Sequence, residues 1–175
     1  MDRASNVINL PYHIHQAFSG RYFIGHTPLV TLDVNLQAWA ALVNPADSNV
    51  NVYLSTFTVS NYNDFPVQAM VWLAAAPRFG YESRDVAVTN RTILPHPSPL
   101  AKVVYATNKK SAISEGTSIY PRIVGPFSTA VSDDDGKIVI PPDCAAILQL
   151  STLEQPRGTA AAAFGWWEEG RRRVR

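Results

Sequence analysis

The sequence predicts an all-β protein: a single-domain β-sandwich, jelly-roll-like, with an extended N-terminal arm. Short runs of β-branched and aromatic residues alternate with clusters of Pro, Gly, Asn and Asp, which is the pattern of strands separated by turns. No stretch combines the apolar spacing of an amphipathic helix with helix caps. The 175 residues, of which 46% are hydrophobic and 17% charged, suit one globular domain.

The chain divides into an arm, a sandwich and a tail. Residues 1–20 are expected to form the extended arm, because Pro11 and scattered apolar side chains there lack helical spacing. The sandwich domain is expected over residues 21–169, and residues 170–175 form a basic C-terminal tail. Strands are expected near residues 21–24, 28–34, 37–43, 50–60, 66–75, 85–89, 101–106, 118–124, 127–132, 136–140, 145–152 and 159–167.

Turn chemistry sets the boundaries of these strands. Asn- and Asp-rich segments at residues 44–49 and 61–66 flank the run 50–60, which predicts a central strand with a turn at each end. The acidic segment 132–136 ends in glycine and predicts a tight hairpin turn. The alanine run 160–163 has high helix propensity, but turn residues precede it and aromatic residues follow, so we expect a strand.

The bulk composition limits the classes of function. A formal net charge of +1 gives little attraction for nucleic acid or anionic lipid, and little repulsion between copies. Cys144 is the only cysteine, which excludes an internal disulfide and a cysteine-based metal cluster. The N-terminus lacks the basic and apolar regions of a secretory signal, and no window has the ~20 apolar residues of a membrane span. We expect cytoplasmic synthesis without a signal peptide, no membrane partner, and a final location at a spore surface or outside the cell after release.

Four segments carry a resemblance to a known family. They are GRYFIG at residues 20–25, AWAALVNP at 38–45, GKIVIPP at 136–142 and AFGWWEE at 163–169. The chain resembles an uncharacterised family of small single-domain β proteins from spore-forming bacteria, a domain of unknown function with no assigned activity. It is more loosely similar to the jelly-roll subunits of endospore appendages, which assemble by inserting arms or strands into neighbouring subunits. This resemblance implies a structural, spore-associated role.

Groups that could carry chemistry are scattered along the sequence. His13 and His15 could supply two metal ligands from one side of an extended strand, but His26 and His96 lie in separate segments. The acidic run 133–135 lacks the spaced oxygens and the distal glutamate of a calcium loop. No nucleophile motif is present. We therefore expect no enzyme activity, no cofactor and no metal.

The first functional hypothesis is a non-enzymatic structural protein that self-assembles into a fibre or a surface layer. Its arm would add a strand to an exposed sheet edge of a neighbouring copy and bury apolar side chains there. The partner is thus the protein itself, as a homo-oligomer or filament. The arm residues expected to make this contact are Leu10, Tyr12, Ile14 and Phe18.

The alternative is a carbohydrate-binding, lectin-like module, because flat indole rings can stack on sugar rings. The candidate stacking residues are Trp39, Trp72 and Trp167. Glycans or other surface proteins would then be the partners. Nucleic acid is not expected as a partner, since the arginine-rich tail is a single basic cluster on a nearly neutral chain.

Overall fold

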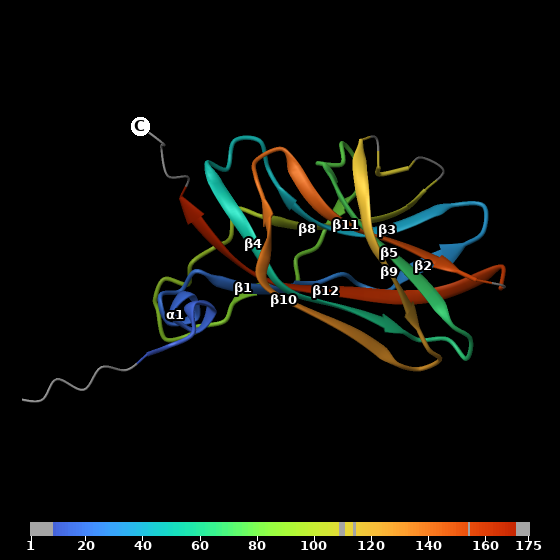
Figure 1. Cartoon of the computed structure of the whole chain (residues 1–175), viewed down its shortest axis with the longest axis horizontal. Coiled ribbons are helices and arrows are strands. Elements are labelled where there is room, and N and C mark those ends of the chain that lie inside the picture. Colours follow the sequence, from blue (N-terminus) through green and yellow to red (C-terminus); the bar gives the residue numbers. More distant parts are fainter. Residues whose placement is uncertain (1–8, 109–110, 114, 154, 171–175) are drawn as a thin grey trace, which may run out of the picture.

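The structure is a computed structural model that describes residues 9–108, 111–113, 115–153 and 155–170. Its strands form two six-stranded sheets that pack face to face (Figure 1). Sheet A contains β1 (Tyr22–His26), β2 (Val30–Asp33), β4 (Val50–Asn61), β7 (Val86–Val88), β10 (Thr129–Ile140) and β12 (Arg157–Gly170). Sheet B contains β3 (Gln37–Asn44), β5 (Val67–Ala75), β6 (Tyr81–Glu82), β8 (Lys102–Asn108), β9 (Gly116–Val124) and β11 (Cys144–Thr152). The predicted single-domain β-sandwich is confirmed.

All the strand pairings are antiparallel, and most join segments distant in sequence. Sheet A has the order β10, β4, β12, β1, β7, with β2 beside the first part of β12. Sheet B has the order β6, β8, β3, β11, β5, β9. The predicted central strand is β4, which lies between β10 and β12. The jelly-roll-like connectivity stays a prediction.

The main core lies between the two sheets and follows the alternation of side chains along each strand. In β5, Val67, Ala69 and Val71 are buried, while the residues between them point the other way. The alanine run is part of β12, as predicted, because Ala160 and Ala162 are buried in this core. The small alanine side chains let the two sheets approach closely. This tertiary packing outweighs the helix propensity of the alanine run.

The prediction of an extended arm is wrong for residues 12–18, which form a short helix, α1 (Tyr12–Phe18). The Pro11 carbonyl accepts hydrogen bonds from the backbone N–H groups of Ile14 and His15, which starts the helix directly after the proline. One turn later, Gln16 is buried against sheet A. The helix is therefore fixed by contacts with its own sandwich, and seven residues are too few to show helical periodicity. Residues 1–8 of the predicted arm lie outside the described residues.

The acidic segment 132–136 is not a hairpin turn. It lies inside β10 (Thr129–Ile140), one continuous strand that joins residues 129–132 of the strand predicted at 127–132 to the strand predicted at 136–140. Asp135 and Gly136 have φ values of 50° and 75°, and the register with β4 shifts between Asp133 and Ile138. A β-bulge therefore replaces the turn, because positive φ at two successive residues bends the strand without reversing it.

The long edge strands are protected against pairing with another chain. Pro121 removes a backbone donor from β9, the edge of sheet B. The bulge and the acidic residues 133–135 interrupt β10, the edge of sheet A. The opposite edges are the short strands β6 and β7. Such features discourage strand addition at a sheet edge.

Candidate functional site

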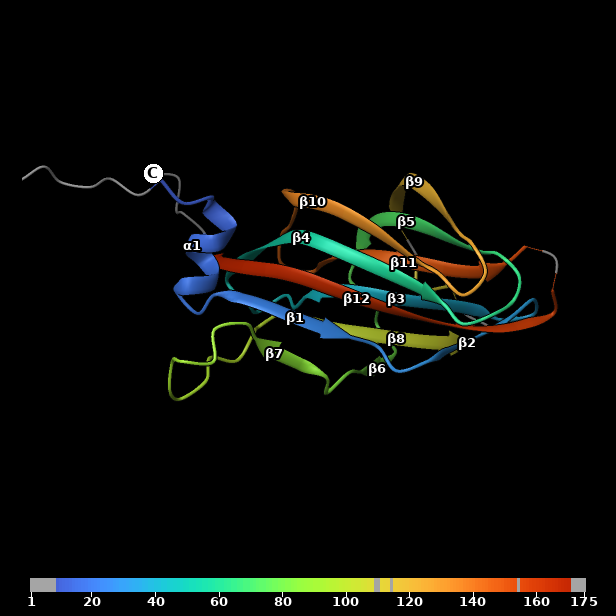
Figure 2. The ribbon, with the colours of Figure 1, turned by 90° about the horizontal axis from the view of Figure 1, so that it is seen from below.

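The outer face of sheet A carries an apolar hollow. Ile24, 49% exposed, and Ala163 face outward on neighbouring strands, and Figure 2 shows no helix or strand over this face beyond α1 at one end. The hollow has a volume of about 650 Å³. Its lining comprises Ile24, Gly25, His26, Thr56, Thr58, Arg84, Asp85, Val86, Ala87, Ala163, Phe164 and Gly165.

The hollow exists because small side chains face outward along the middle of sheet A. Gly165 lies opposite Ile24 on one side and Thr56 on the other. A β-carbon at Gly165 would lie 2.9 Å from Thr56 Cγ2 and 2.9 Å from the Tyr22 hydroxyl. Because Gly165 has no side chain, Thr56 and Tyr22 pack over the strand at this position. The surface at Gly165 is therefore recessed and forms part of the hollow.

An aromatic row closes one end of this face beneath α1. Trp167 stacks on Tyr53 with the ring centroids 5.2 Å apart and the planes at 2°, and Tyr22 packs on its other side at 6.4 Å. From α1, Tyr12 meets the same indole edge-on at 6.1 Å. The three tyrosine rings cover Trp167 so well that only 4% of its surface is exposed.

Glu169 fastens α1 to this row. Its Oε1 accepts hydrogen bonds from the Tyr12 hydroxyl at 2.6 Å, from Gln16 Nε2 at 3.1 Å and from Trp167 Nε1 at 3.1 Å. The hydrogen bond to Glu169 also raises the pKa of Tyr12. One carboxylate oxygen thus joins the helix to the last strand.

Glu168, the preceding residue, points the opposite way, into the sandwich. Its carboxylate accepts the backbone N–H groups of Leu100 and Ala101, the latter at 2.9 Å, and Trp166 Nε1 at 3.1 Å. These bonds hold the end of the connector that precedes β8. No local sequence pattern indicates this anchor, because Leu100 and Ala101 lie 68 and 67 positions away from Glu168.

The end of the sandwich opposite α1 is held by two asparagines. Asn61 Nδ2 donates to the carbonyls of Phe65, Val124 and Gly125, at 2.7, 3.2 and 2.8 Å. Asn63 Nδ2 donates to Asn61 Oδ1 at 2.6 Å and bridges to the Thr159 carbonyl at 2.8 Å. Two loops and the start of β12 are therefore cross-linked at this end.

Two large apolar side chains of these loops, Tyr62 and Phe127, and Ile123 near the end of β9 are what we call the apolar tip. They are 53%, 73% and 67% exposed, in this order. Phe127 also has a φ of 43°, an unusual conformation for a bulky side chain, and its N–H donates to the Asn63 carbonyl at 3.0 Å. Phe127 lies in the turn before β10, whereas the sequence analysis had placed it in a strand.

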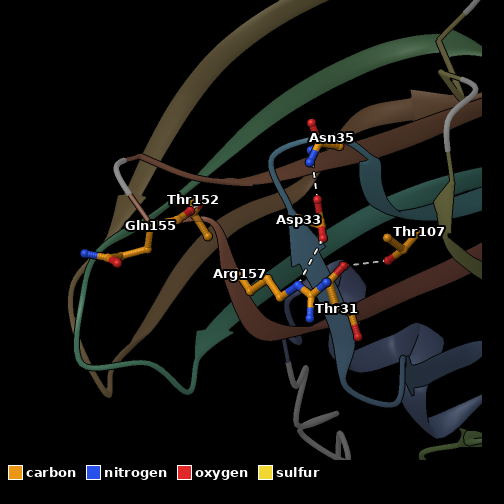
Figure 3. A network of polar contacts seen from close by, with 7 residues as sticks. All are labelled: Thr31, Asp33, Asn35, Thr107, Thr152, Gln155 and Arg157. Carbon is orange, nitrogen blue, oxygen red and sulfur yellow. Dashed lines mark hydrogen bonds and ion pairs between the residues drawn. The ribbon is translucent and has the colours of Figure 1, made fainter.

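A second polar network lies near the apolar tip and ties β2 to its neighbours (Figure 3). Arg157 Nε donates to Asp33 Oδ2 at 3.3 Å, and the backbone N–H of Asn35 donates to Asp33 Oδ1 at 2.9 Å. The Asn35 N–H, followed by Arg157, lowers the pKa of Asp33. Thr107 Oγ1 donates to the Thr31 carbonyl at 2.6 Å, which links the two sheets. The network therefore stabilises the start of β12.

The outer face of sheet B differs from that of sheet A, because segments of the chain cover part of it. Trp39 packs edge-on against Phe79 with centroids 5.7 Å apart, and Ala112 and Ile113 pack on the same cluster. Residues 76–80 and 111–113 supply this cover. An apolar hollow that no part of the described chain covers is thus a feature of sheet A.

The sequence model of a family of unknown function, DUF6143, matches residues 2–172. The chain belongs to this family. No curated protein and no solved structure matches it. As the DUF6143 family has no assigned function, the chemistry of the surfaces described above is the guide to what this member does.

The four residues predicted for self-association lie on or beside α1 in this DUF6143 protein. Leu10, Tyr12 and Phe18 are exposed, and Ile14 is half-buried. Asn90 Nδ2 donates to the Phe18 carbonyl at 2.8 Å, which adds another bond between the helix and its own sandwich. The residues therefore do not form the extended strand that arm exchange requires.

The expected row of exposed tryptophans does not form in this DUF6143 chain. Trp39 is 1% exposed and Trp167 is covered by α1, so neither indole presents a face to solvent. Trp72 is half-buried on sheet B, and its Nε1 donates to Gln149 Oε1 at 3.2 Å.

The remaining polar candidates are dispersed. His13 Nδ1 lies 2.9 Å from Asp135 Oδ1, while His15 stacks on Tyr12. Within the described ranges, no group of three or more metal-ligating side chains comes together. Cys144 is half-buried at the start of β11. No helix in the described part of the chain has the length and apolar character needed to span a membrane, and residues 171–175 of the arginine tail lie outside that part.

Proposed function

We propose that this DUF6143 protein is a non-enzymatic structural subunit that associates with copies of itself, as a fibre or a surface layer that can include the spore surface. The observation that supports the proposal is the apolar hollow on sheet A, which the described residues leave open, whereas the chain covers part of the outer face of sheet B. Exposed apolar surface with a polar surround is typical of protein interaction sites.

The route of association differs from strand exchange by the arm. Residues 12–18 are folded onto the parent sandwich, and Pro121 and the β10 bulge protect the long sheet edges. Side-chain contacts between surfaces therefore replace main-chain pairing as the source of affinity.

Sedimentation velocity tests the proposal on the full chain. We expect species heavier than the 19.2 kDa monomer that increase with protein concentration, and elongated particles in negative-stain images. Contacts worth as little as about 4 kcal/mol give association near 1 mM. A single monomeric species up to about that concentration would contradict the proposal.

A carbohydrate-binding role is the second candidate, and Trp72 is the observation in its favour. This half-buried indole lies beside two hydrogen-bonded amides on sheet B. Its Nε1 donates to Gln149 Oε1, and Gln149 Nε2 donates to Gln37 Oε1 at 2.7 Å. An aromatic ring beside amide groups suits sugar hydroxyls. Binding should shift tryptophan fluorescence on titration with polysaccharide, and Trp72→Phe should abolish the shift. An unchanged spectrum with every polysaccharide tested would exclude this role.

A further inference from the structure

We propose that association is head to tail: the apolar tip of one copy seats in the hollow on sheet A of the next. The inference rests on the proposed self-association and adds the two surfaces that meet. They lie on different parts of the molecule, the tip at the end of the sandwich opposite α1 and the hollow on the outer face of sheet A.

The tip has the features of an anchor for binding. Phe127 is held with positive φ and 73% of its surface exposed, although a polar or glycine residue would fit this turn with less strain. Asn61 and Asn63 fix the loops around it, so little conformational entropy is lost when the tip is buried. Aromatic anchors that fill a pocket on the partner are typical of interface hot spots.

The hollow is complementary to the tip in shape and in chemistry. Its volume of about 650 Å³ is lined by small and aliphatic side chains such as Ile24 and Ala163. This volume can hold an aromatic side chain. Enclosing such a side chain removes about 150–250 Å² of its surface from water. The tip side chains come from two turns and the end of β9 and are more than half exposed, so they can enter a depression.

Opposite charges border the two surfaces. Arg84 lines the hollow and is exposed, and Asp64 is exposed next to Asn63 in the tip loops. Neither makes an ion pair with another residue of the described ranges. Seating Phe127 in the hollow can bring Asp64 towards the partner's guanidinium, and such pairing sets orientation more than affinity. Asp85 on the same border disfavours a tip that enters the other way round.

Face-to-face stacking of two copies of sheet A is hindered by α1. Stacked sheets lie about 10 Å apart, and a helix with its side chains is about 10–12 Å wide. Because α1 projects from the end of this face, it fills the space that a second sheet would need. A tip in a hollow is a contact between two unlike surfaces, which repeats from copy to copy and produces an open chain when the rotation does not close.

Two variants test this arrangement. Phe127→Asn removes the anchor but tolerates positive φ, and Ala163→Gln places a long polar side chain in the hollow. Each variant alone should sediment as a monomer where the wild type is assembled, with association weakened more than about tenfold. An equimolar mixture should form a species of two chains and nothing larger, because it contains one intact tip and one intact hollow per pair.

Phe18→Ser is the matched control, since Phe18 is 66% exposed on α1 and lies outside both surfaces. It should assemble like the wild type, and thermal melts should show all three variants folded. If both variants assemble like the wild type, or if their mixture forms long polymers, the head-to-tail contact is wrong while self-association stands. A wild-type protein that remains monomeric overturns self-association itself, and the head-to-tail contact with it.

Discussion

Replacing Gly136 by alanine is expected to lower the free energy of unfolding by about 3 kcal/mol. Gly136 has a φ of 75°, which costs an L-amino acid about 1–2 kcal/mol. A β-carbon at this position would also lie 1.9 Å from Trp167 Cη2, inside the indole ring. Trp167 is itself packed between Tyr22 and Tyr53, so the ring cannot move aside without disrupting the aromatic row.

Thermal unfolding measures this effect. The loss corresponds to a melting temperature lower by about 6–12 °C for a domain of this size. Gly170→Ala is the matched control, because a β-carbon at Gly170 meets no atom within 4 Å, and its melting temperature should stay near that of the wild type. Equal melting temperatures for both variants would show that the β10 bulge does not pack against Trp167 as described.

Replacing Glu168 by alanine is expected to cost about 3–5 kcal/mol, the second large effect. Glu168 is 8% exposed, and its carboxylate accepts the backbone N–H groups of Leu100 and Ala101 together with the Trp166 indole N–H. Alanine would leave these donors without an acceptor, and each buried donor without a partner costs about 1–3 kcal/mol.

Denaturant unfolding with a graded series checks this prediction. Glu168→Gln keeps one carbonyl oxygen and should fall between the wild type and Glu168→Ala. Glu82→Ala removes an exposed ion pair with Lys102 and should change stability by less than about 1 kcal/mol. The anchoring role of Glu168 is refuted if Glu168→Ala unfolds at the same denaturant concentration as Glu82→Ala.

The strands could be predicted because their signals are local. Alternating side chains mark β5, and turn residues mark both ends of β4, so neither prediction needs a distant partner. Helix α1 depends instead on Glu169, more than 150 positions away, which accepts hydrogen bonds from Tyr12 and Gln16. A pattern within residues 1–20 cannot contain that information.

The β10 bulge and the hollow were missed for a related reason. A glycine after three aspartates signals positive φ, but whether the chain then reverses or bulges depends on the Trp167 ring that covers Gly136. The hollow arises from the pairing of β1, β12 and β4, which brings Ile24, Gly165 and Thr56 side by side. For Phe127 the sequence does contain a signal of a functional role. The segment Gly-Pro-Phe-Ser has the composition of a turn, and an aromatic side chain is not needed to form one.

The position of β12 also has a consequence for synthesis on the ribosome. This last strand pairs with β1, β2 and β4, and its Glu168 and Glu169 hold a mid-chain connector and the N-terminal helix. The early strands of sheet A therefore have no central neighbour while translation is in progress. Sheet A can be completed only after β12 (Arg157–Gly170) has left the exit tunnel, and nascent chains halted before residue 157 should remain open to proteases and chaperones.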